Sequence, residues 1–193
     1  MLVYRLTGAT WAETVVPVKG VSYIPAIALT PDASAIVVGA PGLSSGYPGG
    51  VGVYRWNGTA YAMTLVTAGI NFPGFTFSRM GSSVATNADA TMILAGAPLT
   101  DSKGAAFLLV WNGAAGKWNV TKWQPPVLSG NGYGSTGDNC GVGAAMARDG
   151  STMVYGCWLS ASGGNNRGKV FFVEGLPQPT AAPPPNPMPP PSP

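Results

Sequence analysis

The sequence contains no histidine and little charge. Of its 193 residues only 9% are charged, and ten Lys and Arg against seven Asp and Glu leave a net charge of +3. Without histidine, Ser–His and Cys–His nucleophile arrangements are excluded, together with the commonest zinc ligand. The basic residues form no run, whereas phosphate binding needs clustered cations. We therefore expect neither an enzyme nor a nucleic-acid-binding protein. Asp101 and Asp138 are the candidates for a catalytic acid/base pair, but we favour the interpretation that each is a solvated turn residue.

Long apolar runs are also missing. No window approaches the roughly 18 apolar residues of a membrane-spanning segment, and no segment has an apolar period of 3.6. Residues Met1 to Arg5 have the pattern of a strand and lack the basic and apolar regions of a secretory leader. We expect no membrane span, almost no helix, and a mature or partial sequence.

What the chain does contain is a repeat. The segment from Ala28 to Pro41 recurs from Ala85 to Pro98 and again from Ala145 to Trp158. The aligned positions include an aspartate (Asp32, Asp89, Asp149) and a glycine (Gly39, Gly96, Gly156), at intervals of 57 and 60 residues. Repetition with this spacing is typical of arrayed β-units.

Each copy predicts a small antiparallel meander. A short apolar strand, a tight polar turn and a β-branched strand are followed by a Gly/Ser loop and further strands, bounded by turn residues. The predicted third strands are 51–56, 106–111 and 170–173, and the fourth strands are 61–66 and 118–123. Residues 3–8 match 53–58, and Trp11 stands where Tyr61 does, so residues 1–18 read as the last two strands of a preceding unit. We expect sheets of two, four, four and three strands.

The second copy is the most specific. Residues 81–98, followed by Lys103-Gly104-Ala105-Ala106-Phe107 and a tryptophan, resemble the FG-GAP repeat of integrin-α-like β-propellers. The resemblance covers roughly residues 1–175 and is weakest in the third copy, where Gly-Cys-Trp replaces Gly-Ala-Pro. It implies an all-β fold, a propeller-like array of four-stranded antiparallel blades, with about three blades plus partial ones. Some family members bind calcium in a loop rich in aspartate, but each loop here has one carboxylate, too few for a calcium cage. We expect no metal and no cofactor.

Thirteen strands fall short of a typical propeller of four or more four-stranded blades. The chain would then be a fragment of a larger propeller, a small ring completed by a neighbour's strand, or an open array that stacks on identical copies. Unpaired sheet edges at both ends favour pairing between molecules, so we expect a homo-oligomer or polymer.

The two cysteines, Cys140 and Cys157, predict a disulfide. In the first copy Pro31 suits the second position of a type I turn, which Thr30 and Ala33 would close. By alignment Ala147 and Gly150 close the turn of the third copy, so that paired residues sum to 297, which places the cysteines opposite each other at a non-hydrogen-bonded pair about 4.5 Å apart. Two buried thiols are the alternative, and a bulge at Gly150 would instead place Cys140 opposite Trp158. A disulfide would indicate an oxidising compartment.

Two sequons point the same way. Asn57 and Asn119 each begin an Asn-X-Thr tripeptide near the predicted turn between third and fourth strands, where a bulky glycan is accessible to solvent. The sequence therefore predicts N-glycosylation at both.

Residues 177–193 contain ten prolines and form a second region beyond a domain of residues 1–176. Proline fixes φ and lacks an amide donor, so an extended polyproline II rod is predicted. The segment resembles the hydroxyproline-rich glycoproteins of plant and green-algal extracellular matrices. That resemblance implies hydroxylation and O-glycosylation, with Pro183, Pro184, Pro185, Pro189, Pro190, Pro191 and Ser192 as candidates. A disordered linker, or a ligand of SH3- or WW-type domains, has the same composition.

Two functions follow as hypotheses. The first is a structural, self-assembling extracellular glycoprotein, a subunit of a fibre, surface appendage or cell wall whose tail contacts neighbouring subunits. The second is an integrin-α-like adhesion module that binds a protein or carbohydrate. The tryptophans Trp123 and Trp158 depart from the repeat and would suit sugar stacking in the second case.

Overall fold

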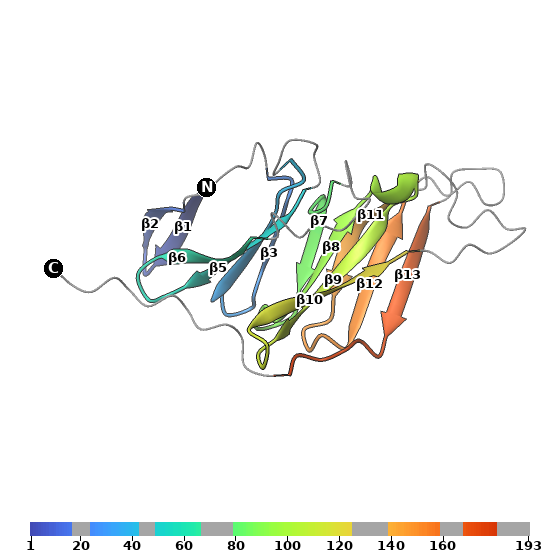
Figure 1. Ribbon diagram of the computed structural model, residues 1–193. Coiled ribbons are helices and arrows are strands. Elements are labelled where there is room, and N and C mark those ends of the chain that lie inside the picture. The colour runs from blue at the N-terminus through green and yellow to red at the C-terminus, as the bar shows by residue number, and fades with distance from the viewer. Residues whose placement is uncertain (17–23, 43–48, 67–78, 125–138, 159–167, 181–193) are drawn as a thin grey trace, which may run out of the picture.

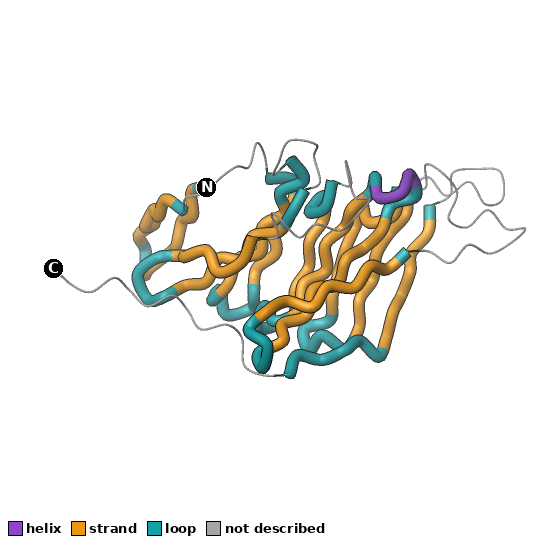
Figure 2. Tube along the Cα trace, in the orientation of Figure 1, coloured by secondary structure: helices purple, strands orange, loops and turns teal. Residues whose placement is uncertain are grey.

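The computed structural model describes residues 1–16, 24–42, 49–66, 79–124, 139–158 and 168–180. Within these ranges the chain is all-β, with thirteen strands in four antiparallel sheets and one short helical turn, η1 (Thr100–Ser102). Figure 2 shows how completely strands dominate. Among the described residues no helix has the length and apolar character needed to cross a membrane.

The sheets have the strand numbers that the repeat predicts. Sheet 1 contains β1 (Leu2–Thr7) and β2 (Thr10–Val15). Sheet 2 contains β3 (Ala26–Leu29), β4 (Ala35–Gly39), β5 (Val51–Trp56) and β6 (Tyr61–Val66). Sheet 3 contains β7 (Ser83–Thr86), β8 (Met92–Ala97), β9 (Ala105–Asn112) and β10 (Lys117–Trp123). Sheet 4 contains β11 (Cys140–Met146), β12 (Thr152–Cys157) and β13 (Lys169–Glu174).

The four sheets stand face to face in a row, with β1–β2 at one end and β13 at the other (Figure 1). Sequential strands are neighbours throughout, as expected of meanders. The strands of sheet 1 and sheet 4 do not join, so the described part of the chain forms an open row and no closed ring.

An apolar core lies between each pair of neighbouring sheets. Successive strand residues point to opposite faces, and in β8 both faces are covered. Ile93 and Ala95 pack in the cluster with sheet 2, and Met92 and Leu94 in the cluster with sheet 4. All six residues of β8 are buried. An unbroken apolar strand of this kind therefore reflects its position inside the stack.

Three equivalent turns join the first two strands of sheets 2, 3 and 4. In the first, the Ala33 N–H donates to the Thr30 carbonyl at 2.8 Å, which is the closing bond that the proline predicts. The strand ladder begins later, however, with the Thr30 N–H donating to the Ala35 carbonyl at 3.0 Å. Ala33 has a φ of +55°, and the Ser34 N–H donates to the Asp32 carboxylate at 3.0 Å, so both residues extend the turn. The predicted register is therefore wrong by two residues.

Glycines bring neighbouring sheets into backbone contact. A Cβ on Gly96 of β8 would overlap the carbonyl oxygen of Gly141 in sheet 4. Gly39 of β4 has the same relation to Gly81, which precedes β7 of sheet 3. Both Gly81 and Gly141 have a φ of +93°, a conformation that favours glycine. The Ser83 hydroxyl also donates to the Gly141 carbonyl at 2.8 Å. The repeat thus preserves glycine where two sheets meet most closely.

Candidate functional site: terminal sheets and modification positions

The structure contains a disulfide between Cys140 and Cys157, which pair across β11 and β12. The register that brings the two cysteines together differs from the predicted one. Along most of the two strands paired residues sum to 299, as for Gly143 opposite Gly156. A bulge that inserts residues 141 and 142 then returns Cys140 to the position opposite Cys157. The alternative in which Cys140 faces Trp158 is wrong.

The bulge is placed by packing against sheet 3. The Cys140 N–H donates to the carbonyl of Lys103, which lies between η1 and β9 of sheet 3, at 3.0 Å. Gly141 lies against Gly96 and the Ala105 carbonyl. These contacts hold the first residues of β11 against sheet 3, so the bulge absorbs the two-residue difference between this region and the rest of the ladder.

The three turn aspartates have the same structural role. The carboxylates of Asp32, Asp89 and Asp149 each accept the N–H of the residue two positions later, at 3.0, 3.1 and 2.9 Å. The hydrogen bond from the Ser34 N–H is the main cause that lowers the pKa of Asp32 to about 2, and the Ser34 and Thr30 hydroxyls add to it. These carboxylates therefore cap the turns. No group of His, Cys, Asp or Glu suited to a metal occurs in the described part of the chain.

Asp101 is engaged in a surface ion pair. Its Oδ2 lies 2.9 Å from Lys122 Nζ and accepts a hydrogen bond from Gln124 at 2.9 Å. The Lys122 hydrogen bond is the main cause of the lowered pKa of Asp101. A carboxyl held in its charged form is poorly suited to donate a proton. Asp138, its suggested acid/base partner, lies outside the described residues.

The two sequons occupy different positions in their sheets. Asn57 lies in the β5–β6 turn, where its Oδ1 accepts the Thr59 N–H at 3.0 Å and the Thr59 hydroxyl at 2.9 Å. Asn119 is not in a turn: it lies within β10, opposite Val110, where its side chain and that of Thr121 are exposed. Both sequons thus lie near the turn between third and fourth strands, as predicted, but they are not equivalent: Asn57 follows Trp56 of β5, whereas Asn119 follows Trp118 of β10, which pairs with Trp111 as Tyr61 pairs with Trp56.

Three of the four tryptophans that recur with the repeat are packing residues, whereas the fourth, Trp11 in sheet 1, is 64% exposed. Trp56 and Tyr61 pair across β5 and β6 with ring centroids 5.2 Å apart, and Trp111 and Trp118 pair across β9 and β10 at 5.6 Å. Edge-to-face pairs of this kind stabilise adjacent strands.

The two tryptophans outside the repeat differ from each other. Trp123 is half-buried and packs against the core between sheets 3 and 4. Trp158, just after β12, is 62% exposed. Trp158 therefore presents a ring to solvent, whereas Trp123 is part of the fold.

The first residues of the proline-rich region lie on the chain's own sheets. Leu176 is buried in the core between sheets 3 and 4. The Gln178 side chain then donates to the Gly150 carbonyl at 3.3 Å, and the Thr180 hydroxyl donates to Asn112 Oδ1 at 3.3 Å. These contacts direct residues 177–180 from sheet 4 toward sheet 3. The remaining candidates for hydroxylation or O-glycosylation, Pro183–Pro185, Pro189–Pro191 and Ser192, lie outside the described residues.

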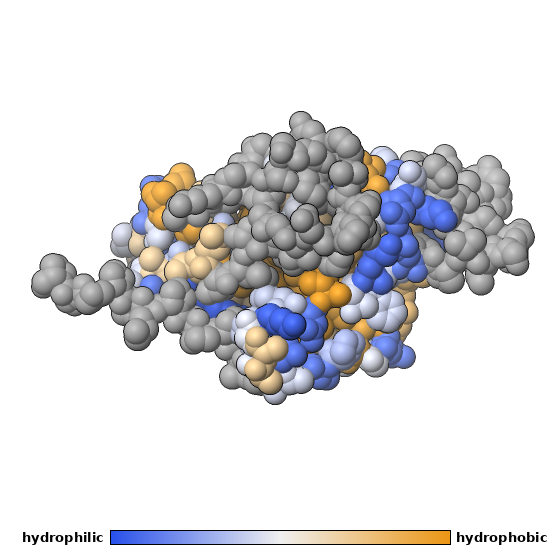
Figure 3. Space-filling view, in the orientation of Figure 1, coloured by the Kyte–Doolittle hydropathy of each residue, from blue (hydrophilic) through white to orange (hydrophobic). Residues whose placement is uncertain are grey.

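The outer faces of the terminal sheets carry exposed apolar side chains. At one end Leu2, Tyr4, Leu6, Trp11 and Val15 are exposed. At the other end Val170 and Phe172 of β13 are exposed. Hydrophobic residues gather at the β1–β2 end in the space-filling view (Figure 3). Exposed apolar faces at both ends of such a row are typical of interaction surfaces.

No protein-family model matches the chain, and no curated protein matches it. The resemblance to FG-GAP repeats and to hydroxyproline-rich glycoproteins therefore rests on residues 1–175 and 177–193 of this chain alone.

Proposed function

We propose that the chain is a structural, self-assembling extracellular glycoprotein, a subunit of a fibre, surface appendage or cell wall. Its propeller-like sheets form the body of each subunit, and its proline-rich region, an extended polyproline II rod, contacts neighbouring subunits. The observation that carries the proposal is the open row with an exposed apolar sheet face at each end. Each such face is a site at which another sheet can pack.

The Cys140–Cys157 disulfide supports an extracellular location, because disulfides persist in oxidising compartments. The accessible sequons at Asn57 and Asn119 and the prolines of residues 177–193 support glycosylation. The absence of histidine and the capping role of the turn aspartates support a non-enzymatic protein.

Electron microscopy combined with intact-mass analysis of native material tests the proposal. We expect end-to-end polymers, steps of 16 Da for hydroxyproline, and sugar ladders that shorten in an Asn57→Gln, Asn119→Gln double variant. A protein that remains monomeric at every concentration, with the mass of its bare sequence, would contradict it.

A second candidate is an integrin-α-like binding module for a protein or carbohydrate. It is favoured by the exposed ring of Trp158, since aromatic faces stack on sugars. A glycan array separates the two functions. A monodisperse protein whose glycan binding is lost in Trp158→Ala, but kept in Trp11→Ala, would support the binding module.

A further inference from the structure

The row of sheets repeats one interface. In sheets 1 to 3, one face is covered by the sheet that follows in the chain, and we call this face the next-face. The equivalent face of sheet 4 has the same name, although no sheet follows it. The opposite face of each sheet is its previous-face. In sheet 3 the next-face includes Leu94 and Leu108, which are neighbours across β8 and β9 and fully buried. They share a core with Met153 and Tyr155 on the previous-face of sheet 4. The interface is therefore built from two chemically distinct halves.

Sheet 4 carries the same next-face without a cover. Val154 and Phe172 are neighbours across β12 and β13, as Leu94 and Leu108 are in sheet 3. Phe172 is nevertheless 65% exposed, whereas Leu108 is 0% exposed. The next pair along, Gly156 and Val170, matches Gly96 and Ala106 in the same way, and Val170 is also exposed. The next-face of sheet 4 is thus an apolar surface of the type that a following sheet covers elsewhere in the row.

Sheet 1 carries the opposite half. Tyr4 of β1 matches Tyr54 of β5 in the aligned segments, and Leu6 opposite Trp11 matches Trp56 opposite Tyr61. Tyr54 lies on the previous-face of sheet 2, in a core shared with Val16 and Val3, and is 2% exposed. Tyr4 is 54% exposed. The Tyr4 hydroxyl donates to Glu13 at 2.6 Å, so the one carboxylate on this face is already hydrogen-bonded.

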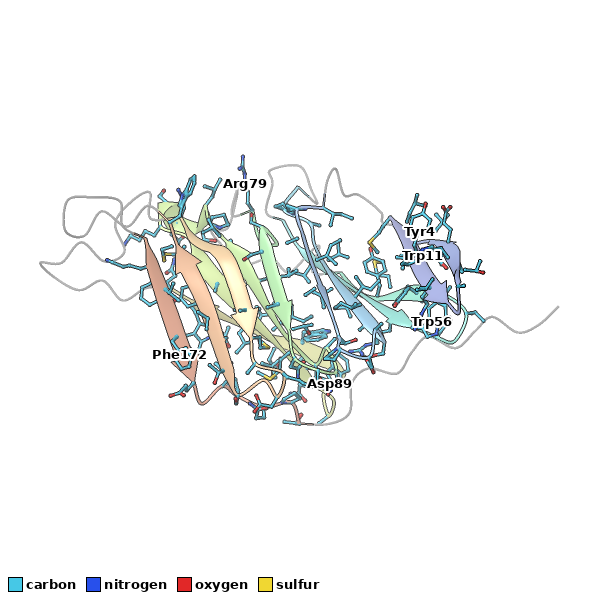
Figure 4. All side chains as sticks on the ribbon, turned by 180° about the vertical axis from the view of Figure 1, so that it is seen from behind. Tyr4, Trp11, Trp56, Arg79, Asp89 and Phe172 are labelled. Carbon is cyan, nitrogen blue, oxygen red and sulfur yellow. A yellow bond between two sulfur atoms is a disulfide. The ribbon has the colours of Figure 1, made fainter. Side chains whose placement is uncertain are left out.

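The two uncovered halves lie at opposite ends of one molecule. Figure 4 shows Phe172 at one end of the row and Tyr4 and Trp11 at the other. The previous-face and the next-face are the two halves that meet at every internal boundary, yet within one open row these two cannot reach each other. A second copy can supply the missing half to each.

We infer that subunits join head to tail, with the previous-face of sheet 1 of one copy packed on the next-face of sheet 4 of another. This inference rests on the proposed self-assembly and specifies its interface. The contact joins two different surfaces, so each added copy exposes a new site of each kind, and growth continues as a filament unless the rotation closes a ring. A symmetric contact between two sheet-4 faces would instead place two next-faces together, a combination that occurs at no internal boundary.

Sedimentation velocity over a range of concentrations tests this interface with the full chain. Leu6→Lys removes the sheet-1 face and Phe172→Lys removes the sheet-4 face, because a lysine on a terminal strand opposes sheet association. Leu99→Lys is the matched control, since Leu99 is exposed between β8 and η1, away from both faces. Each face variant should associate at least about tenfold more weakly than wild type, and the control should not.

An equimolar mixture of the two face variants gives the sharper result. The Phe172→Lys copy keeps its sheet-1 face and the Leu6→Lys copy keeps its sheet-4 face, so the mixture should form a two-subunit species that neither variant forms alone. Association of Leu6→Lys by itself would show a symmetric contact and overturn the inference.

Other outcomes separate the inference from the proposed function. Wild-type assembly that both variants leave unchanged would overturn the interface alone, whereas a wild type that never associates would overturn the proposed function as well. Near-ultraviolet circular dichroism checks that each variant is folded. Tyr4→Lys and Val170→Lys replace any variant that is not.

Discussion

The glycine that recurs in the second strand of each repeat allows a paired test of how the sheets are held together. Gly96 and Gly156 are equivalent positions, but a Cβ on Gly96 would overlap the Gly141 carbonyl oxygen and the Ser83 hydroxyl. A Cβ on Gly156 would have the Lys169 carbonyl oxygen, 3.8 Å away, as its nearest neighbour, which is ordinary van der Waals contact. The same substitution, to alanine, therefore meets a filled interface in one case and open space in the other.

The expected magnitudes follow from these surroundings. In Gly96→Ala, overpacking costs about 1–3 kcal/mol, and loss of the hydrogen bond from Ser83 to Gly141 costs about 1 kcal/mol more. Removal of a glycine from a strand returns about 0.5–1 kcal/mol. The net loss in the free energy of unfolding is then about 1–3.5 kcal/mol, which lowers Tm by about 2–4 °C for each kcal/mol in a chain of this length. Gly156→Ala should be neutral or stabilising by about 0.5 kcal/mol.

Denaturant unfolding followed by tryptophan fluorescence measures both variants under one set of conditions. Monomeric protein must be used, so that self-association does not contribute to either free energy. Equal stability of Gly96→Ala and Gly156→Ala would refute the close backbone contact between sheets 3 and 4. It would also refute the comparison of the exposed next-face of sheet 4 with the covered next-face of sheet 3.

Three further predictions concern the residues that join and cap the sheets. Replacing Cys140 and Cys157 by serine opens a loop with a sequence separation of 17, which should cost about 3 kcal/mol on the chain-entropy account; an unchanged urea midpoint would contradict this. Arg55→Met removes two guanidinium hydrogen bonds to carbonyls of the β7–β8 turn, each 3.0 Å long. Hydrogen bonds from a charged group are worth about 1.5–3 kcal/mol each before their desolvation cost, so the variant should lower the unfolding free energy by about 2–4 kcal/mol. Because the pKa of Asp32 is lowered in the folded protein to about 2, its contribution to stability is complete above its unfolded pKa of about 4 and is lost as the pH falls toward 2; Asp32→Asn should flatten this part of the pH–stability curve, and an identical acid limb in the variant would show that Asp32 does not contribute.

The local features of the fold were predictable because they depend on neighbouring residues in the chain. The Pro-Asp pair at Pro31 and Asp32 indicated a turn, and the observed closing hydrogen bond from Ala33 to Thr30 has the predicted partners. Alternating and β-branched runs placed the strands, and the strand numbers of two, four, four and three agree with the sheets. The pairing of Trp56 with Tyr61 follows from the same local pattern.

Registers and positions in the hairpins were less predictable. The turn at Thr30 continues through Ser34, because the Asp32 carboxylate binds the Ser34 N–H and the chain accepts a positive φ at Ala33. The same longer turn occurs before β12, so most of β11 is displaced from the predicted register. Nothing in the spacing of the sequence alone distinguishes a turn of four residues from one of six.

The sequence by itself determined an all-β chain of repeated hairpins, because strand formation and turn chemistry are set by residues close together along the chain. The Cys140–Cys157 disulfide was predicted from the sequence, but only the tertiary structure decided the bulged register that brings the two cysteines together, since the bulge at residues 141 and 142 packs against sheet 3. The tertiary structure also decided which of several equivalent apolar faces stay uncovered. Leu108 and Phe172 are chemically similar and equivalent in register, and they differ in exposure because a sheet covers one and none covers the other.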